Sequence, residues 1–242
     1  MSHSDQVADS RWKNLYRVGG IAPLVALAFY LIEALAIGLG GTYPTTTESW
    51  YALLQRNKLL GLLDLNALDI LSIALLGTLF LALYQLLKRY SESYMAIATF
   101  FAFLGIAVFV VPRVAMLSIL LLSDQYAAAA TEAQRTRILT AGDTLGSLGT
   151  ATPQTAGFFF IAAAVLIISL VMLRSGAFGK ATAYAGILAG VITVANDFSL
   201  VVAPSIAGLI MPISGVFWIV WWVLISRMLF KLSGNLPEKI VA

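Results

Sequence analysis

The stretch TAGFFFIAAAVLIISLVML, residues Thr155–Leu173, decides the fold of this chain because it is apolar throughout and carries no charge. A helix of about 20 apolar residues, rising about 1.5 Å per residue, crosses the hydrocarbon core of a bilayer. A short basic turn, Arg174–Lys180, separates this stretch from a second apolar run over Ala181–Ala203. Together the two runs predict a transmembrane helical hairpin.

Four further runs of the same kind lie on the N-terminal and C-terminal sides of this hairpin. They cover Val18–Gly40, Leu59–Leu87, Tyr94–Leu122 and Ile206–Leu229. The composition agrees, because 60% of the 242 residues are hydrophobic and only 11% are charged, whereas a soluble domain carries roughly 25% charged residues. The sequence therefore predicts an all-α, polytopic integral membrane protein with a six-helix bundle over residues 18–232. The contact partner of that bundle is the lipid bilayer.

The basic residues orient the bundle. Cytoplasmic loops of membrane proteins are enriched in lysine and arginine. With a cytoplasmic N-terminus, ten of the fifteen basic residues fall in inner segments, four fall in outer segments, and Arg113 lies inside a run. We therefore expect cytoplasmic tails over residues 1–17 and 233–242. The first run is longer than the apolar part of a signal peptide, so we expect it to be a retained helix.

Two outer segments, residues 41–58 and 123–154, are longer than a simple connection needs. Thr45–Asn57 and Asp124–Leu139 are each predicted to form a short outer helix. Gly142–Pro153, with three glycines and a closing proline, is predicted to be a loop. Gly186 and Gly190 form a pattern that lets helices approach closely. We interpret it as packing within the chain, with a dimer face as the alternative.

Several chemistries are excluded by residue types that the bundle lacks. There is no cysteine, the one histidine is His3 in the N-terminal tail, and every lysine lies at or beyond the end of an apolar run. A thiol nucleophile, a histidine-ligated metal or haem, and a retinal Schiff base all fail for this reason. We predict no cofactor and no metal, and we assign no catalytic residue. The net charge of +3 is spread between the runs, which indicates topology determinants and no nucleic-acid partner.

Ionisable residues inside the runs mark the candidate site, because each costs about 2.5–3.5 kcal/mol on insertion into a membrane. With their polar companions they are Glu33, Asp64, Asn66, Asp69, Arg113, Gln154, Asn196 and Asp197. The predicted topology brings all of them, from five helices, into the outer half of the bundle. The sequence therefore predicts a polar cavity that opens outward.

The spacing refines this prediction. Asn66 and Asp69 are three residues apart and share a face of a continuous helix, whereas Asp64 is rotated by roughly 140° from Asp69. We therefore expect Asp69 to point inward and Asp64 to lie near the interface. Arg227 lies near the inner end of the last run, so Arg113 is the one cation in the outer half of the runs, where it can pair with one or two of the four carboxylates.

Three segments resemble a known family. They are Tyr16–Gly20 (YRVGG) before the first run, Leu81–Lys88 (LALYQLLK) at the end of the second, and the hairpin Leu170–Asp197 with its turn RSGAF. In these segments, and over about residues 11–232, the chain resembles the bacterial membrane-protein family catalogued as domain of unknown function 4386. The resemblance implies a six-helix protein of a prokaryotic cytoplasmic membrane. It implies no activity and no site residues.

Four functional interpretations remain open at this stage. The buried charges could only fasten helices together. The leading functional hypothesis is a non-enzymatic protein that binds a small or amphiphilic ligand in the outward cavity, or that serves as an accessory subunit of a membrane complex. The alternatives are a proton- or cation-coupled transporter and an intramembrane enzyme, both of which would use the intramembrane carboxylates.

Overall fold

The structure is a computed structural model that describes residues 10–40 and 43–235. These residues form helices and no strand. The helices are α1 (Lys13–Gly40), α2 (Thr47–Arg56), α3 (Lys58–Asp64), α4 (Ala67–Leu87), α5 (Glu92–Met116), α6 (Ile119–Ala128), α7 (Glu132–Thr152), α8 (Phe158–Ser175), α9 (Lys180–Val202) and α10 (Pro204–Asn235). A 3₁₀ turn, Ser10–Trp12, precedes α1, and a π-helical turn, Pro153–Gly157, joins α7 to α8.

The prediction of an all-α, six-span membrane bundle is confirmed. Six helical segments of the described chain are long and apolar enough to cross a bilayer: Lys13–Gly38, Ala67–Leu87, Glu92–Ala128, Glu132–Ser175, Lys180–Val202 and Ser205–Gly234. Large apolar side chains such as Phe100, Val201 and Leu209 are exposed on their outer surface. An apolar exterior suits lipid, and helices satisfy their own backbone groups there.

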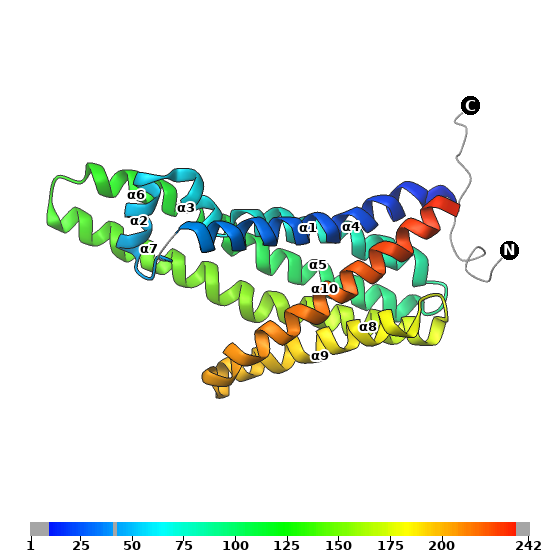
Figure 1. Ribbon diagram of the computed structural model, residues 1–242. Helices are drawn as coiled ribbons and strands as arrows, with labels where there is room; N and C mark the ends of the chain where they lie inside the picture. The colour runs from blue at the N-terminus through cyan, green and yellow to red at the C-terminus, as the bar shows by residue number, and fades with distance from the viewer. Residues whose placement is uncertain (1–9, 41–42, 236–242) are drawn as a thin grey trace, which may run out of the picture.

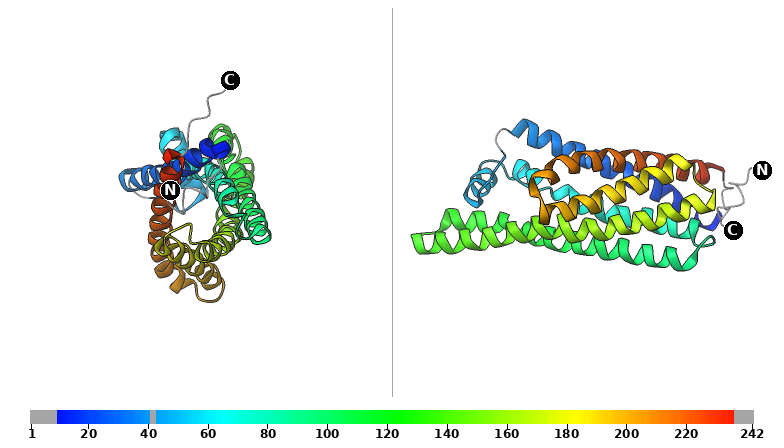
Figure 2. Two further views of the ribbon diagram at one scale, coloured as in Figure 1. Left: turned by 90° about the vertical axis from the view of Figure 1, so that its right-hand side faces the viewer. Right: turned by 90° about the horizontal axis from the view of Figure 1, so that it is seen from below.

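The six long helices form a closed ring. In the order α1, α4, α5, α8, α9 and α10, each helix packs against the next, and α10 returns to α1. Figure 2 shows this ring end-on, from the end where the chain begins and finishes. At that end the ring is filled by apolar side chains, including Tyr16, Leu83, Met95, Trp221 and Leu229. We call the opposite end the distal end.

The ring is less tightly closed toward the distal end. Figure 1 shows α10 crossing the bundle obliquely, from α1 near the chain termini to the far end of α9. Gly20 of α1 lies against Leu229 and Phe230, and further along the ring of Tyr30 stacks on Trp222 at 5.9 Å. Beyond these contacts α1 and α10 diverge, because α10 stays with α9.

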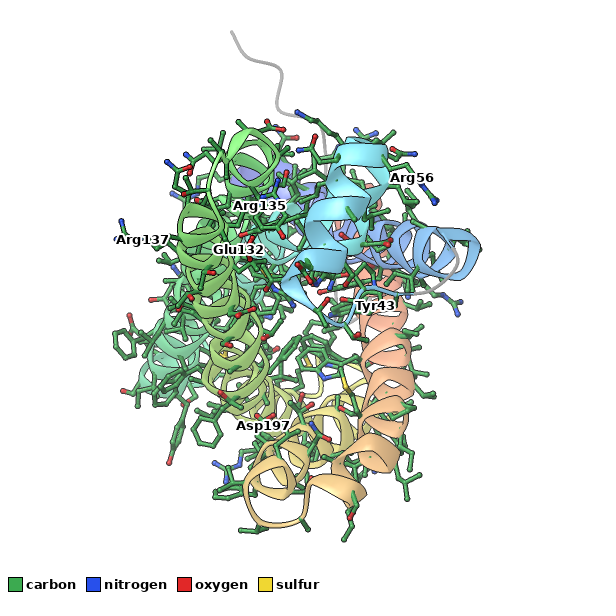
Figure 3. The ribbon with its side chains drawn as sticks, turned by 90° about the vertical axis from the view of Figure 1, so that its left-hand side faces the viewer. Tyr43, Arg56, Glu132, Arg135, Arg137 and Asp197 are labelled. Atoms are coloured by element: carbon green, nitrogen blue, oxygen red, sulfur yellow. The ribbon has the colours of Figure 1, made fainter. Side chains whose placement is uncertain are left out.

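A second, smaller core caps the distal end. It is built by α2, α3, α6 and the start of α7 around Tyr51, Leu54, Leu65, Met116 and Ile119. The Tyr51 hydroxyl donates a hydrogen bond to the Ile138 carbonyl at 2.9 Å. Burial, the Asp143 carboxylate and the Tyr126 phenol together raise the pKa of Tyr51 to about 12. The cap is therefore a packed element, whose outer face carries the charged side chains seen in Figure 3.

The two predicted outer helices have different outcomes. The first is confirmed as α2, whose Thr46 side chain accepts a hydrogen bond from the Ser49 N–H. The prediction of one helix over Asp124–Leu139 is wrong, because α6 ends at Ala128 and α7 begins at Glu132. Thr131 starts the new helix through a reciprocal capping bond with Gln134.

The predicted loop over Gly142–Pro153 is also wrong, since this stretch is most of α7 and runs through the π turn into α8. Two of its glycines allow close packing between helices and do not form turns. A Cβ on Gly142 would meet Thr47 and Tyr51, and a Cβ on Gly149 would lie 2.6 Å from the Met116 Cβ. Small residues at these positions let α7 lie directly on the cap and on α5.

Glycines also bring the ring helices together. Gly190 faces Leu166 and Ala162 of α8, and Gly186 faces Ser169 of α8 and Trp221 of α10. Packing within the chain thus occupies the face for which a dimer was the alternative. Helices α5 and α8 also approach closely at Gly105, where an added Cβ would lie 2.7 Å from Ile161 Cγ1 and 2.9 Å from the Gly157 carbonyl oxygen.

We expect Gly105→Ala to destabilise the bundle by about 1–3 kcal/mol, because the methyl group would force α5 away from α8. Gly146→Ala in α7 is the matched control, since nothing lies within 4 Å of its added Cβ. In a helix this control is expected to be neutral or stabilising by up to about 1 kcal/mol. The unfolding midpoints in detergent test this, and equal midpoints would contradict the packing described.

Candidate functional site

The predicted polar residues all lie toward the distal end, but the structure places five of the eight in two separate groups. Glu33, Asp69 and Arg113 form one group among α1, α4 and α5, which we call the charged triad. Asn196 and Asp197 of α9 line a separate cavity. The prediction that these residues share a single polar cavity is therefore wrong.

The charged triad fastens three helices. One Glu33 carboxylate oxygen accepts a hydrogen bond at 2.8 Å from the backbone N–H of Leu68, in the first turn of α4. On the same helix, an Asp69 carboxylate oxygen lies 3.7 Å from Arg113 Nη2 of α5. Only 3%, 7% and 5% of Glu33, Asp69 and Arg113 are exposed. Charges buried this deeply need such partners, because an isolated buried charge is very costly.

The charge of the triad is unbalanced. Two carboxyl groups, which are electrostatic neighbours, are accompanied by one guanidinium group, which pairs with Asp69. The guanidinium also lies 5.5 Å from the centre of the Phe109 ring, at a distance suited to a cation–π contact. Asp69 Oδ1 and Arg113 Nε have no hydrogen-bond partner. The group can therefore fasten helices, and it retains capacity for a proton or a small cation.

Two of the remaining predicted residues, Asp64 and Asn66, lie where the predicted second run is broken. Asn66 adopts a left-handed conformation, φ 54° and ψ 46°, between α3 and α4. It therefore does not share a continuous helical face with Asp69, and that prediction is wrong. Asp64 is buried at the end of α3. Gln154 lies in the π turn, and its side chain is outside the described part of the structure.

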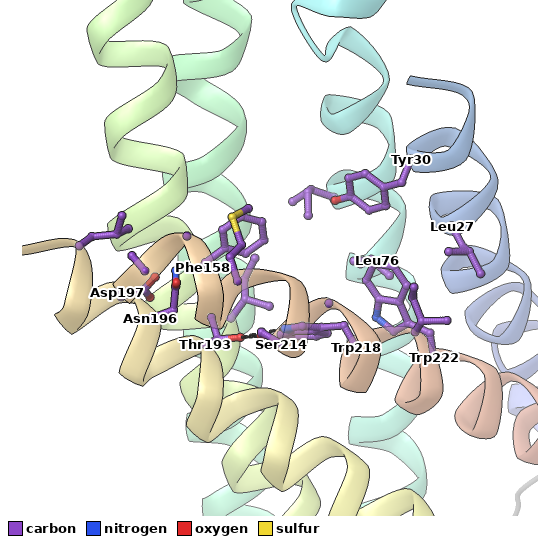
Figure 4. Close-up of a pocket in the computed structure, with 18 residues that line it drawn as sticks. Leu27, Tyr30, Leu76, Phe158, Thr193, Asn196, Asp197, Ser214, Trp218 and Trp222 are labelled. Carbon is purple, nitrogen blue, oxygen red and sulfur yellow. Dashed lines mark hydrogen bonds between the residues drawn. The ribbon is translucent and has the colours of Figure 1, made fainter. Parts of the chain in front are cut away.

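The second place is a cavity of about 430 Å³ between α1, α4, α8, α9 and α10. Figure 4 shows its lining side chains, which are mostly apolar. They are Leu27, Tyr30, Ile73, Leu76, Phe158, Ile161, Thr193, Asn196, Asp197, Leu200, Ala207, Gly208, Met211, Ser214, Gly215, Trp218, Ile219 and Trp222. The predicted polar cavity is thus corrected to an apolar one that contains a few polar groups.

One polar patch on the cavity wall is internally satisfied. The Thr193 and Ser214 hydroxyl oxygens lie 2.7 Å apart across α9 and α10. The indole N–H of Trp218 donates to Thr193 Oγ1 at 2.9 Å, and the Thr193 hydroxyl also donates to the Ala189 carbonyl. These bonds hold α9 to α10 and fix the Trp218 ring against the cavity, as the dashed lines in Figure 4 indicate.

The Asp197 end of the cavity is not satisfied. Asp197 and Asn196 are each 8% exposed, and neither Asp197 carboxylate oxygen has a hydrogen-bond partner. The Asn196 Oδ1 atom also lacks one. None of the lining residues is a lysine or an arginine. Buried polar groups in folded proteins are normally paired, so this end of the cavity can accept hydrogen bonds from a bound group.

Tyr30 stands between the two places. Its ring extends from α1 toward the cavity (Figure 4) and stacks on Trp222. The phenol is also within electrostatic range of Asp69, Glu33 and Arg113. A molecule in the cavity would therefore contact a side chain that also interacts electrostatically with the charged triad.

Sequence reasoning did not identify Tyr30, Thr193, Ser214, Trp218 or Trp222 as site residues. A signal was present in the last span, where small, polar and aromatic residues recur every three or four positions. These residues are Ala207, Met211, Ser214, Trp218 and Trp222. Residues at this spacing share one helical face, and Thr193 and Asn196 lie one turn apart on α9 in the same way.

A family model described as "Domain of unknown function (DUF4386)" matches residues 28–231 of the chain. That range contains all six long helices in whole or in part, together with the charged triad and every cavity-lining residue except Leu27. Neither the curated proteins nor the solved structures contain a match to the chain.

We expect Arg113→Ala to lower the free energy of unfolding by about 3–5 kcal/mol, because it leaves the Asp69 carboxylate buried without its positive partner. The double variant Asp69→Asn/Arg113→Gln removes both charges and is expected to recover most of that loss. Chemical unfolding in detergent measures both. If the single and double variants were equally destabilised, the pair would not be what fastens α4 to α5.

Proposed function

The chain belongs to the DUF4386 family, and we propose that it is a multi-pass membrane protein that binds an amphiphilic molecule inside its helical ring. The observation that supports this proposal is the apolar cavity with unpaired acceptor groups at one end. Ligand sites are typically concave and mostly apolar, with a few polar groups that orient the ligand. The cavity has this character.

The surroundings of the cavity favour a ligand that comes from the bilayer. The cavity is lined by α1 and α10, the two helices that diverge toward the distal end. Two of its lining residues on α10, Met211 and Ile219, are 55% and 42% exposed, so this wall of the cavity is part of the accessible surface. In a membrane that surface faces lipid, so an amphiphile could reach the cavity without crossing water.

The charged triad supports this assignment by contrast. Its members are bound to one another and to the backbone of α4, and none of them lines the cavity. Their first role is to stabilise the packing of α1, α4 and α5. The transporter hypothesis keeps one point in its favour, the unbalanced charge of two carboxyl groups and one guanidinium. The intramembrane-enzyme and accessory-subunit hypotheses gain no comparable support and stay predictions.

We place the protein in a prokaryotic cytoplasmic membrane with both termini in the cytoplasm. The support is the excess of basic residues in the segments on the terminal side and the family to which the chain belongs. The distal end, with the cap and the Asp197 end of the cavity, then faces outward.

The orientation is testable with single cysteines, since the chain contains none of its own. Arg137→Cys, exposed on the cap, is expected to react with a membrane-impermeant maleimide on intact spheroplasts. Glu92→Cys, exposed at the opposite end, is expected to react only after the membrane is permeabilised. The reverse pattern would invert the proposed topology.

Binding is testable through the cavity tryptophans. A single-chain alcohol carrying bromine atoms on its chain is expected to quench Trp218 and Trp222 fluorescence saturably in phosphatidylcholine nanodiscs. Replacing both with phenylalanine should remove most of the saturable component, because these two line the cavity, whereas Trp12 and Trp50 do not, and Trp221, although it packs 5.7 Å from Trp218, does not line it either.

Gly208→Leu should block the cavity, since Gly208 lines it and an added Cβ meets nothing within 4 Å. Gly234→Leu, on the same helix and equally open, is the matched control and should bind like the native chain. Unsaturable quenching that is identical in all of these variants would refute ligand binding in the cavity.

A further inference from the structure

The unpaired atoms at the Asp197 end of the cavity share one property, which is that all of them accept hydrogen bonds. They are the two carboxylate oxygens of Asp197 and the amide oxygen of Asn196. The neighbouring Asn196 amide interacts favourably with Asp197, but neither Asp197 carboxylate oxygen has a hydrogen-bond partner. A group that completes this end must therefore donate hydrogens.

The charge of the lining residues further restricts the chemical class of the ligand's head group. Asp197 is the one ionisable carboxyl group among the lining residues, and no lysine or arginine lines the cavity. The Arg113 guanidinium pairs with Asp69 instead. An ionised carboxylate in an apolar surrounding needs a positive partner, and a charge-assisted hydrogen bond is about twice as strong as a neutral one. An anionic head group would be repelled by the Asp197 carboxylate and would find no lysine or arginine in the lining.

Resting on the proposed function, we infer that the ligand is a single-chain amphiphile whose head is a protonated primary amine, held by Asp197 and Asn196. A primary ammonium group presents three donors, as a lysine head does. Three unpaired acceptor oxygens at the end of the cavity match that number.

The shape of the cavity supports a single chain. Its lining residues on α10 extend from Ala207 to Trp222, a distance of about 22 Å along the helix. The volume of about 430 Å³ lies near the lower end of the usual range for ligand sites, about 300–1,000 Å³. A long and narrow space suits one extended chain.

The two ends of the cavity lie at different depths in the membrane, as the head and the chain of an amphiphile do in a leaflet. Asp197 lies five residues before the end of α9, so it is about 8 Å from the distal limit of that helix. Trp218 and Trp222 lie further toward the middle of α10. The amine would thus sit near the distal boundary of the membrane, with its chain running inward past Thr193, Trp218 and Tyr30.

The experiment is a competition in phosphatidylcholine nanodiscs, whose lipid carries no primary amine. Dodecylamine, dodecanol, dodecanoate and butylamine each compete with the brominated alcohol for quenching of Trp218 and Trp222. We expect dodecylamine to displace the probe at least about ten-fold more tightly than dodecanol, because one charge-assisted contact is worth a factor of this order. Dodecanoate should be weaker than dodecanol.

Butylamine separates a membrane amphiphile from a water-soluble amine, since both carry the same head. Weak displacement by butylamine supports the amphiphile, whereas displacement as tight as that by dodecylamine would overturn the requirement for a chain.

Asp197→Asn should erase the preference for the amine over the alcohol, and Asp197→Glu should retain part of it. Asp64→Asn, which removes a buried carboxylate outside the cavity, is the matched control and should keep the native preference. Equal thermal unfolding midpoints for these variants would exclude a general loss of structure.

The two proposals fail in different ways. If dodecylamine and dodecanol displace the probe equally well in the native chain, the amine assignment is wrong while the binding function stands. If the probe shows no saturable quenching at all, the binding function itself is wrong. An amine preference that survives Asp197→Asn would also overturn the assignment to this residue.

Discussion

The hydrogen bond from the Leu68 N–H to the Glu33 carboxylate is the contact on which the distal half of the bundle depends. The second span is interrupted at Asn66, which leaves the first backbone donors of α4 without partners in their own helix. Lipid cannot supply acceptors, so a side chain must. Glu33 does so from α1, and Asp69 in the next position links the same turn to Arg113 of α5. Helices α1, α4 and α5 are thereby fixed together.

The cavity lies on the other side of the ring, where the described residues of α9 and α10 make no comparable charged contact with the distal half of α1. Helices α9 and α10 bind one another through Thr193, Ser214 and Trp218 and depart from α1 beyond the Tyr30–Trp222 stack. One half of the ring is fastened by charge and the other by hydroxyl groups. The space between the halves is left to apolar and aromatic side chains, with Asp197 unpaired at its end.

The sequence was sufficient for the number of spans and for the height of each polar residue along its helix. Apolar run length determines both, since lipid imposes a fixed thickness. It was not sufficient for the position around each helix or for the neighbour that each helix meets. Asp69 and Asp197 were therefore assigned to one cluster, although α4 and α9 hold them in different places.

The local errors have a common physical origin. Glycine and proline were taken as turn residues in α7, but tertiary packing at Gly142 and Gly149 overrides that propensity. The break at Asn66 was missed because its neighbours are apolar enough to continue a helix. Asparagine tolerates the left-handed conformation, so a single residue could end α3 and begin α4 without a glycine or proline to mark the place.

The uninterrupted path from α7 through the π turn into α8 has a mechanical consequence. Residues Glu132–Ser175 form one rod whose outer arm, α7, is about 32 Å long. The π turn at Pro153–Gly157 joins this arm to α8, and Phe158 and Ile161, just after the turn, border the cavity. A tilt of about 5° there would sweep the tip of the arm through about 3 Å. A change in the cavity walls at the π turn would therefore be magnified at the outer end of α7, where it packs against α6 of the cap.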